Sequence, residues 1–249
     1  MDLQRIHTTA PRGMVAMGKR GKIPAMETWS DFKLPLDVND IIRGQGAYPE
    51  KIRNRKPALV DAAERARAQG LPLIHPTALV QDVVVKGHFH GHILLDDSSR
   101  LTGSLVTGHL AGAQRISAVL VTIGAELEET STRLFNSDPL MALALDGLGN
   151  AAVEHLGQQV CRRIGEQAQL AGLTASTPLS PGEPGWPVEV GQPQVFDLVD
   201  AARVGIQVTP NGMMIPKKSI SFVVGIGLEM SRIEPCKVCS LRDSCRYHD

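Results

Sequence analysis

Residues 209–221 read Thr-Pro-Asn-Gly-Met-Met-Ile-Pro-Lys-Lys-Ser-Ile-Ser. Asn211-Gly212 is a turn dipeptide, and apolar or β-branched residues lie on both sides of it. The pattern predicts two strands, residues 204–209 and 219–226, joined by a connection that carries Met214 and Pro216.

The segment upstream of these strands predicts a long loop after a long helix. Residues 174–194 are rich in Pro, Gly and Ser and have no hydrophobic period, which is typical of a functional loop. Residues 195–202 predict one or two helical turns. Residues 139–170 predict the longest helix, with Asp138 as its cap. Glycines 147, 149 and 157 would let another backbone approach that helix closely.

Further upstream, short strands are expected at residues 83–85, 92–95, 101–106 and 117–123, and helices from Asp37 onward and over 56–69. The run 117–123 is almost entirely apolar, as in a strand covered on both faces. This order of elements favours an α+β fold. We divide the chain into a basic arm (1–36), one α+β domain (37–228) and a cysteine-bearing tail (229–249).

Composition excludes several classes of function. Lys and Arg number 26, as do Asp and Glu, so the basic excess of a nucleic-acid binder is missing. No apolar run reaches the length of a membrane span, and the N-terminus does not resemble a secretion signal, so a cytoplasmic protein is expected. The motifs of dinucleotide binding, phosphate-loop binding and the esterase nucleophile are missing from the sequence.

Two motifs carry a resemblance to a known family. The first is Ser180-Pro181-Gly182-Glu183-Pro184-Gly185-Trp186-Pro187, and the second consists of Thr209, Met214, Pro216, Ser219 and Ser221. Together they resemble the activation domain of vitamin B12-dependent methionine synthase, over residues 40–228. The resemblance implies a curved, mainly antiparallel sheet flanked by helices.

The resemblance also implies a ligand and a partner. It implies S-adenosylmethionine held by the Pro-Gly loop, and docking on a cobalamin-binding methyltransferase whose inactive cob(II)alamin is reductively methylated. The site residues it implies are Ser180, Pro181, Gly182, Glu183, Trp186, Pro187, Thr209, Met214, Pro216 and Ser219. A Gly/Pro loop suits such a ligand because its backbone groups can approach closely. No residue stands out as an acid, base or nucleophile, which suits a protein whose cofactor carries the chemistry.

The sequence departs from the family pattern at two positions. The family has an arginine four residues before the loop glycine, where this chain has Pro178, and an aromatic residue where it has Glu183. Without the guanidinium, the carboxylate of S-adenosylmethionine loses a bidentate partner. Two hypotheses therefore stand: an accessory protein of corrinoid-dependent methyl transfer, and a binding or scaffold subunit that keeps the fold and has lost the ligand.

Three cysteines near the C-terminus form a candidate metal site. Cys236, Cys239 and Cys245 have the spacing of a ligand cluster, with basic residues nearby that favour the thiolate. They could hold an iron–sulfur cluster, or zinc with Cys161 or His248 as a further ligand. Free thiols or a redox pair at Cys236 and Cys239 is the alternative. An iron–sulfur cluster would suit a one-electron reductant, and a small iron–sulfur electron carrier is a third hypothesis for the protein.

Two other groups of polar residues are open to a structural or a functional interpretation. His88, His90 and His92 would share a face of a strand, as metal ligands do, but Gly87 and Gly91 favour an exposed hairpin. The acidic residues Glu126, Glu128 and Glu129 are expected on a solvated helix face, with contact to a partner as the alternative.

Overall fold

The computed structural model describes residues 26–53, 55–96 and 98–230. It contains a seven-stranded sheet in the order β4-β3-β2-β5-β9-β6, with β1 paired to β2, and a separate two-stranded sheet of β7 and β8. Neighbouring strands in both sheets are antiparallel throughout the described residues. The strands are β1 (Glu27–Trp29), β2 (Thr77–Phe89), β3 (His92–Leu95), β4 (Arg100–Thr102), β5 (Arg115–Thr122), β6 (Thr174–Ala175), β7 (Gln207–Val208), β8 (Met214–Ile215) and β9 (Ser219–Gly227).

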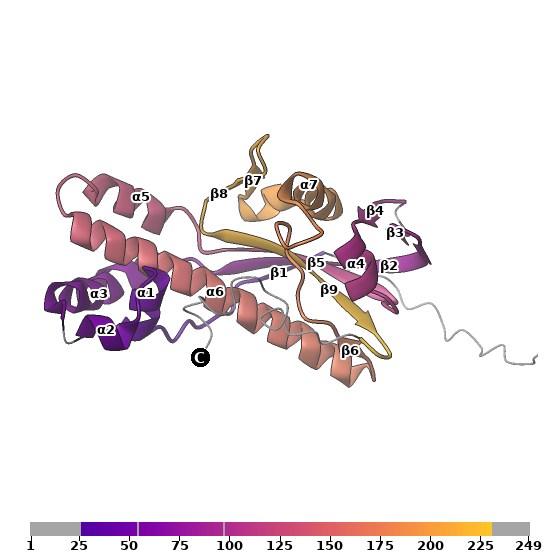
Figure 1. The fold of residues 1–249 in the computed structure, drawn as a ribbon, viewed down its shortest axis with the longest axis horizontal. Helices are drawn as coiled ribbons and strands as arrows, with labels where there is room; N and C mark the ends of the chain where they lie inside the picture. Colours follow the sequence, from indigo (N-terminus) through magenta and orange to yellow (C-terminus); the bar gives the residue numbers. More distant parts are fainter. Residues whose placement is uncertain (1–25, 54, 97, 231–249) are drawn as a thin grey trace, which may run out of the picture.

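Helices cover both faces of the sheet (Figure 1). They are α1 (Val38–Gly44), α2 (Pro49–Arg53), α3 (Pro57–Gly70), α4 (Ser104–His109), α5 (Glu126–Leu134), α6 (Pro139–Leu170) and α7 (Val188–Leu198), with short 3₁₀ helices η1 (Leu71–Leu73) and η2 (Ala201–Val204). The predicted α+β fold, a mainly antiparallel sheet flanked by helices, is confirmed.

The central strand β5 divides the core into two parts. Val119, Val121 and Ile123 face the cluster formed with α1, α3, α5 and α6. Ile116, Ala118 and Leu120 face the opposite cluster, which includes Trp186 and residues of α7. Alternate residues of an extended chain point to opposite faces, so an unbroken apolar run is what a doubly covered strand requires.

The long helix α6 packs along one face of the sheet, with α1, α3 and α5 against it (Figure 1). Asp138 caps it, since its side chain accepts a hydrogen bond from the Met141 backbone N–H at 3.1 Å. Gly147 allows the expected close approach: a Cβ there would lie 2.7 Å from the Ile41 carbonyl oxygen of α1. Gly149 lies under side chains of Leu127 and Lys218, whereas no heavy atom lies within 4 Å of a Cβ at Gly157.

Several predicted boundaries were wrong. The strand expected over 101–106 ends at Thr102, because Gly103 has a φ of 128° and turns the chain into α4. The loop expected over 174–194 contains β6, and α7 begins within it at Val188. Of the strand expected over 204–209, only Gln207–Val208 forms.

The N-terminal boundary also differs from the expectation. Within the segment assigned to the arm, β1 pairs with β2 and Trp29 and Leu36 are buried. Residues 26–36 therefore pack on the domain. The rest of the predicted arm, residues 1–25, and the tail cysteines lie outside the described residues. None of the helices in the described ranges is both long enough and apolar enough to cross a membrane.

Candidate functional site

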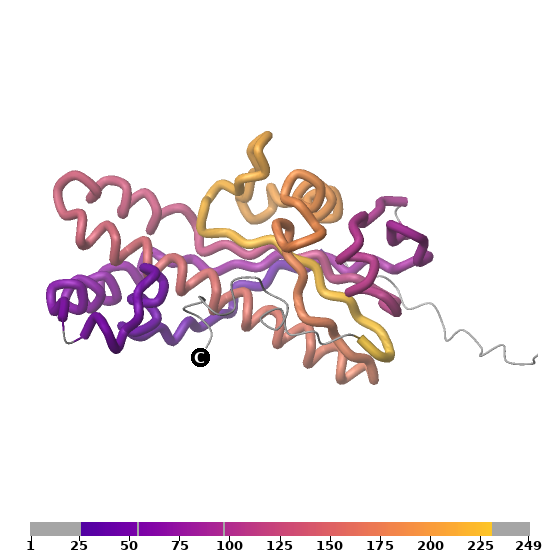
Figure 2. Tube along the Cα trace, in the orientation of Figure 1, coloured from indigo at the N-terminus to yellow at the C-terminus, as the bar shows by residue number. Residues whose placement is uncertain are grey.

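The two motifs singled out in the sequence meet at one groove. The groove has a volume of about 320 Å³ and lies between the loop before α7, the first turns of α7, and the chain from Gly212 to β9. Figures 1 and 2 show the loop crossing over β9 and entering α7 beside β8. Its lining residues are Ser180, Pro181, Val188, Gln192, Gly212, Met213, Met214, Lys217, Ser219, Ile220 and Ser221.

The loop lies against β9 because its backbone adds a bridge to that strand. The Leu179 N–H donates to the Val223 carbonyl at 2.9 Å, and the Val223 N–H donates back at 2.9 Å. Beyond this bridge, Gly182 (φ 100°) and Gly185 (φ 88°) supply conformations that other residues rarely adopt. The glycines thus fold the loop over the start of α7.

Hydrogen bonds within the loop hold its shape. The Gly182 N–H donates to the Trp186 carbonyl at 2.8 Å, and the Ser180 N–H donates to Glu183 Oε1 at 2.8 Å. Burial raises the pKa of the Glu183 carboxyl, against the Ser180 hydrogen bond and the charge of His109, which lower it. Glu183 therefore fixes the loop internally.

Trp186 anchors the loop from below and does not line the groove. Its side chain is fully buried in the core cluster beside α7, and its Nε1 donates to Gln194 Oε1 at 3.3 Å. Gly191 passes directly against the indole, since a Cβ there would lie 2.8 Å from Trp186 Cε2. Pro187 precedes the first residue of α7 and fits its start.

The second motif forms the opposite wall. The Thr209 hydroxyl accepts a hydrogen bond from the Met213 N–H at 3.1 Å, and the Thr209 N–H donates to the Met213 carbonyl at 2.8 Å. The peptide bond before Pro216 is cis. The Ser219 hydroxyl donates to the Pro216 carbonyl at 2.7 Å and so closes the turn into β9.

The predicted site residues thus separate into two groups. Ser180, Pro181, Met214 and Ser219 line the groove, whereas Gly182, Glu183, Trp186, Pro187, Thr209 and Pro216 shape the backbone around it. Sequence reasoning missed Val188 and Gln192, which are four residues apart on α7 and line the groove together. Their spacing could have indicated a shared helical face, had the helix been recognised.

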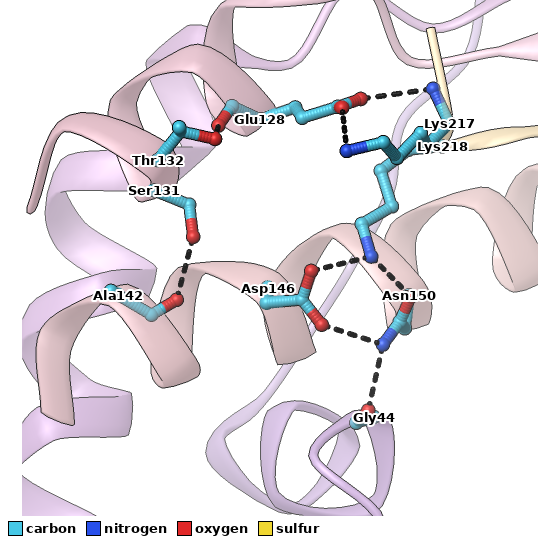
Figure 3. A network of polar contacts seen from close by, with 9 residues as sticks. All are labelled: Gly44, Glu128, Ser131, Thr132, Ala142, Asp146, Asn150, Lys217 and Lys218. Carbon is cyan, nitrogen blue, oxygen red and sulfur yellow. Dashed lines mark hydrogen bonds and ion pairs between the residues drawn. The ribbon is translucent and has the colours of Figure 1, made fainter. Parts of the chain in front are cut away.

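Two lysines that directly precede β9, Lys217 and Lys218, contact polar side chains of helices α5 and α6 (Figure 3). Lys217 lines the groove, and its Nζ and backbone N–H contact the Glu128 carboxylate of α5 at 3.1 and 2.9 Å. Lys218 Nζ lies 2.7 Å from both Asp146 Oδ1 and Asn150 Oδ1 of α6. The acidic residue Glu128, expected on a solvated helix face, is therefore engaged by the chain that borders the groove.

The segment just before the loop brings no cation to the groove. Pro178 stands there, upstream of the bridge between Leu179 and β9. Among the described residues that line the groove, Lys217 is the one basic side chain, and it is paired with Glu128. The remaining wall is mainly apolar, with Pro181, Val188, Met213, Met214 and Ile220.

The candidate metal ligands are not brought together by the part of the chain that the structure describes. There, no group of three or more His, Cys, Asp and Glu side chains could hold a metal ion. His90 lies in the turn between β2 and β3, and His88 Nε2 lies 3.0 Å from the Ala113 carbonyl oxygen. Cys236, Cys239 and Cys245 lie outside the described residues, so their metal role stays a prediction.

A second cavity, of about 490 Å³, lies between α1 and α6. Asp40, Arg43, Glu154 and His155 line it, and His155 Nε2 lies 3.9 Å from Asp40 Oδ1. It includes none of the predicted site residues. We therefore take the groove beside α7 as the candidate site.

Comparisons with known proteins agree with the fold and go no further. No protein-family model and no curated protein matches this chain. The crystal structure of the MetH reactivation domain bound to AdoHcy is similar over 85% of this chain and 81% of that chain, with a TM-score of 0.63. This chain has the fold of the MetH reactivation domain. The sequence identity is 12%, so the similarity to the MetH reactivation domain concerns the fold alone.

Proposed function

We propose that this chain binds S-adenosylmethionine, or its demethylated product S-adenosylhomocysteine, in the groove beside α7. One observation carries the proposal: the Ser180-Pro181 loop and the segment Met214–Ser219 form opposite walls of one groove. The solved MetH reactivation domain of the same fold has AdoHcy bound. The volume of about 320 Å³ and the mainly apolar walls suit a small-molecule site.

We propose further that the chain is an accessory protein of corrinoid-dependent methyl transfer. It would dock on a cobalamin-binding methyltransferase of the methionine synthase type and support its reductive reactivation. S-adenosylmethionine supplies an electrophilic methyl group, while this chain binds and orients it. Exposed apolar side chains on the hairpin next to the groove, Val208, Met213 and Ile215, provide a surface for such docking.

Calorimetric titration of the full chain with S-adenosylhomocysteine tests the binding site. We expect saturable one-to-one binding to the wild type, and loss of binding in Met213→Trp, because the larger side chain fills the groove. Val208→Trp is the matched control, since Val208 is exposed on the same hairpin but does not line the groove. Equal binding to both variants would place the ligand elsewhere on the molecule.

The docking role has its own test. A cobalamin-loaded methionine synthase fragment is mixed with this chain, S-adenosylmethionine and a chemical reductant, and the cob(II)alamin absorbance is followed. We expect the absorbance to decay faster with wild type than with Val208→Asp, which changes the exposed surface of the hairpin without lining the groove. Equal decay rates of the cob(II)alamin absorbance with and without the wild-type chain would contradict the accessory role.

The scaffold hypothesis is favoured by a specific observation. Pro178 replaces the family's arginine, and the groove's one basic side chain among the described residues, Lys217, is already paired with Glu128. A ligand carboxylate would have to compete for that lysine. If S-adenosylhomocysteine does not bind the wild type, the chain keeps the fold as a binding subunit only.

The tail cysteines extend the proposal on the basis of sequence alone. An iron–sulfur cluster at Cys236, Cys239 and Cys245 would supply the electron for reactivation. Anaerobic purification with iron, sulfide and zinc analysis tests this, comparing Cys239→Ser with Cys161→Ser. Cys161 separates a cluster held by the tail alone from a zinc site that also uses Cys161, whose thiol has its pKa raised to about 12 by burial and the charge of Glu154. Iron and sulfide that are present in wild type and lost only in Cys239→Ser would support electron delivery. Zinc or no metal in wild type would contradict electron delivery by the tail.

A further inference from the structure

The groove contains a buried side-chain amide with an unused hydrogen-bond donor. Gln192 lies on α7, lines the groove and is 3% exposed. Its Oε1 accepts a hydrogen bond of 2.8 Å from the hydroxyl of Ser221, which is itself 3% exposed. Its Nε2 is buried and has no hydrogen-bond partner among the residues that the structure describes.

A buried donor without an acceptor lowers the stability of the fold, so its presence at a groove indicates a role in binding a ligand. Nearly all buried polar groups in native proteins are hydrogen-bonded, and a buried donor without an acceptor destabilises the fold. Within the described ranges, the other two buried side-chain atoms of this kind are Gln45 Nε2 and Arg115 Nε. Arg115 Nε lies 3.1 Å from the Asp82 carboxylate, and Gln45 does not line the groove. Gln192 is thus the one whose unused donor belongs to the candidate site.

The surroundings of Gln192 limit the movement of its side chain. Ser221 fixes the carbonyl end from β9. The helix that carries Gln192 is held against Trp186 through Gly191, and Gly212 packs over Val188 one turn earlier. A donor that is already positioned loses little conformational freedom when a ligand binds to it.

The chemistry of the walls indicates which acceptor fits. The side chains of Pro181, Val188, Met213, Met214 and Ile220 are apolar, and no free cation faces them among the described lining residues. A carboxylate would need a charged partner, whereas the neutral ring nitrogen of a flat heterocycle needs one donor between apolar surfaces. Met213 and Met214 also line the groove, and methionine side chains adapt readily to a ligand.

We infer that Gln192 is a specificity-determining residue: its Nε2 donates to a ring nitrogen of an adenine base in the groove. This inference rests on the proposed binding of S-adenosylmethionine and its product. The inference names Gln192 as the residue that recognises the base, and a ring nitrogen as the ligand atom that it contacts. In DNA recognition, glutamine amides contact adenine through both N6 and N7, whereas here Ser221 already bonds the carbonyl end and Nε2 is the donor left for the base.

A comparison of ligand analogues tests the inference without relying on one variant. The full chain is titrated with S-adenosylhomocysteine and with its 1-deaza, 3-deaza and 7-deaza analogues, each of which lacks one ring acceptor. We expect wild type to bind one analogue about tenfold more weakly than the parent ligand, which is the effect of one lost hydrogen bond. Equal affinity for the parent and all three analogues would overturn the inference.

Gln192→Met completes the comparison, because methionine keeps the unbranched shape and removes the donor. It should bind the parent ligand about tenfold more weakly and lose the discrimination between parent and analogue. Gln194→Met is the control: the Gln194 amide is used by Trp186 and Thr102 and does not line the groove, so discrimination should persist.

The outcomes separate this inference from the proposed function. If wild type does not bind S-adenosylhomocysteine, both fail. If wild type binds it and Gln192→Met discriminates as wild type does, only the role of Gln192 fails. Thermal unfolding of each variant shows whether it is folded, and the analogue series on wild type decides the question if Gln192→Met is not.

Discussion

Glu183 shows how a single residue fixes the groove. Its carboxylate accepts the Ser180 N–H inside the loop, and the residue is half-buried. The burial raises the pKa of the carboxyl from its ordinary value of 4.5. The folded chain therefore binds this proton more tightly than the unfolded chain does. The protonated Glu183 carboxyl therefore contributes to the free energy of unfolding. This contribution is fully present below about pH 4.5 and is lost as the pH rises through the folded pKa.

Glu183→Gln keeps the hydrogen-bond acceptor and cannot ionise. We expect its free energy of unfolding to increase relative to wild type as the pH rises from about 4 to about 7, measured by urea denaturation. Asp138→Asn provides the opposite sign. The Met141 N–H and Arg65 lower the pKa of Asp138. The free energy of unfolding of wild type should therefore increase relative to that of Asp138→Asn as the pH rises through the folded pKa. A difference for Glu183→Gln that does not change with pH would contradict the argument.

At the residue scale, the two motifs found in the sequence lie at one groove, but they do not include all of the residues that line it. The Pro-Gly loop and the Met214–Ser219 segment were found by motif, and both border the groove. Trp186 was expected at the ligand and lies in the core, because an indole buries more favourably beneath a glycine-rich loop than at its surface. Gln192 was missed because its significance arises from a missing partner, which only three-dimensional packing reveals.

At the scale of elements, the contact between α1 and α6 depends on glycine. A Cβ at Gly147 would lie 2.7 Å from the Ile41 carbonyl oxygen of α1, and the reciprocal position, Gly44, faces the Gly147 backbone. Backbone atoms cannot move aside as a flexible side chain can. The two helices therefore approach one another more closely than residues with side chains would allow.

Gly147→Ala should destabilise the fold by about 1–3 kcal/mol, because it overpacks this contact. Gly157→Ala is the matched substitution on the same helix, where no heavy atom lies within 4 Å of the new Cβ. It should be neutral or stabilising by up to about 1 kcal/mol, since alanine favours helix. Chemical denaturation measures both changes. Equal destabilisation by the two variants would show that the close approach is not what requires Gly147.

The elements that sequence predicted well are those whose local signals agree with their packing. For α6, the cap at Asp138, Pro139 and the periodic apolar face agree, and β5 is apolar at five of its six positions from Ile116 to Val121. The start of α7 was missed because Gly191 and Pro193 are poor helix formers, and packing against Trp186 outweighs that propensity. Likewise, β1 is only three residues long, and pairing with β2 determines it.

At the scale of the whole molecule, the sheet separates a helical layer from the layer that contains the groove. A chain of polar contacts joins the two around the end of β9 (Figure 3). Lys218 contacts Asp146 and Asn150 of α6, and Asn150 Nδ2 donates to the Gly44 carbonyl of α1 at 2.9 Å. The connection that borders the groove is thereby attached to the two helices on the opposite face.

The adjacent lysines Lys217 and Lys218 differ in how much this attachment should contribute to stability. The Lys218 side chain is 13% exposed and lies between two acceptors, whereas the Lys217 side chain is 64% exposed. Charged hydrogen bonds out of solvent contribute more than solvated ion pairs, because water competes less for the same groups. Lys218→Met should therefore cost about 2 kcal/mol of unfolding free energy. Lys217→Met should cost less than about 0.5 kcal/mol.

A double-mutant cycle shows whether the cost for Lys218 arises from its contact with α6. Asp146→Asn alone, and together with Lys218→Met, is measured by urea denaturation. A coupling energy that accounts for most of the Lys218→Met effect is expected, because the two side chains share a contact of 2.7 Å. If the two lysine variants are equally stable, or the coupling is absent, the groove segment is held by its own turn and β9 pairing rather than by the helical layer.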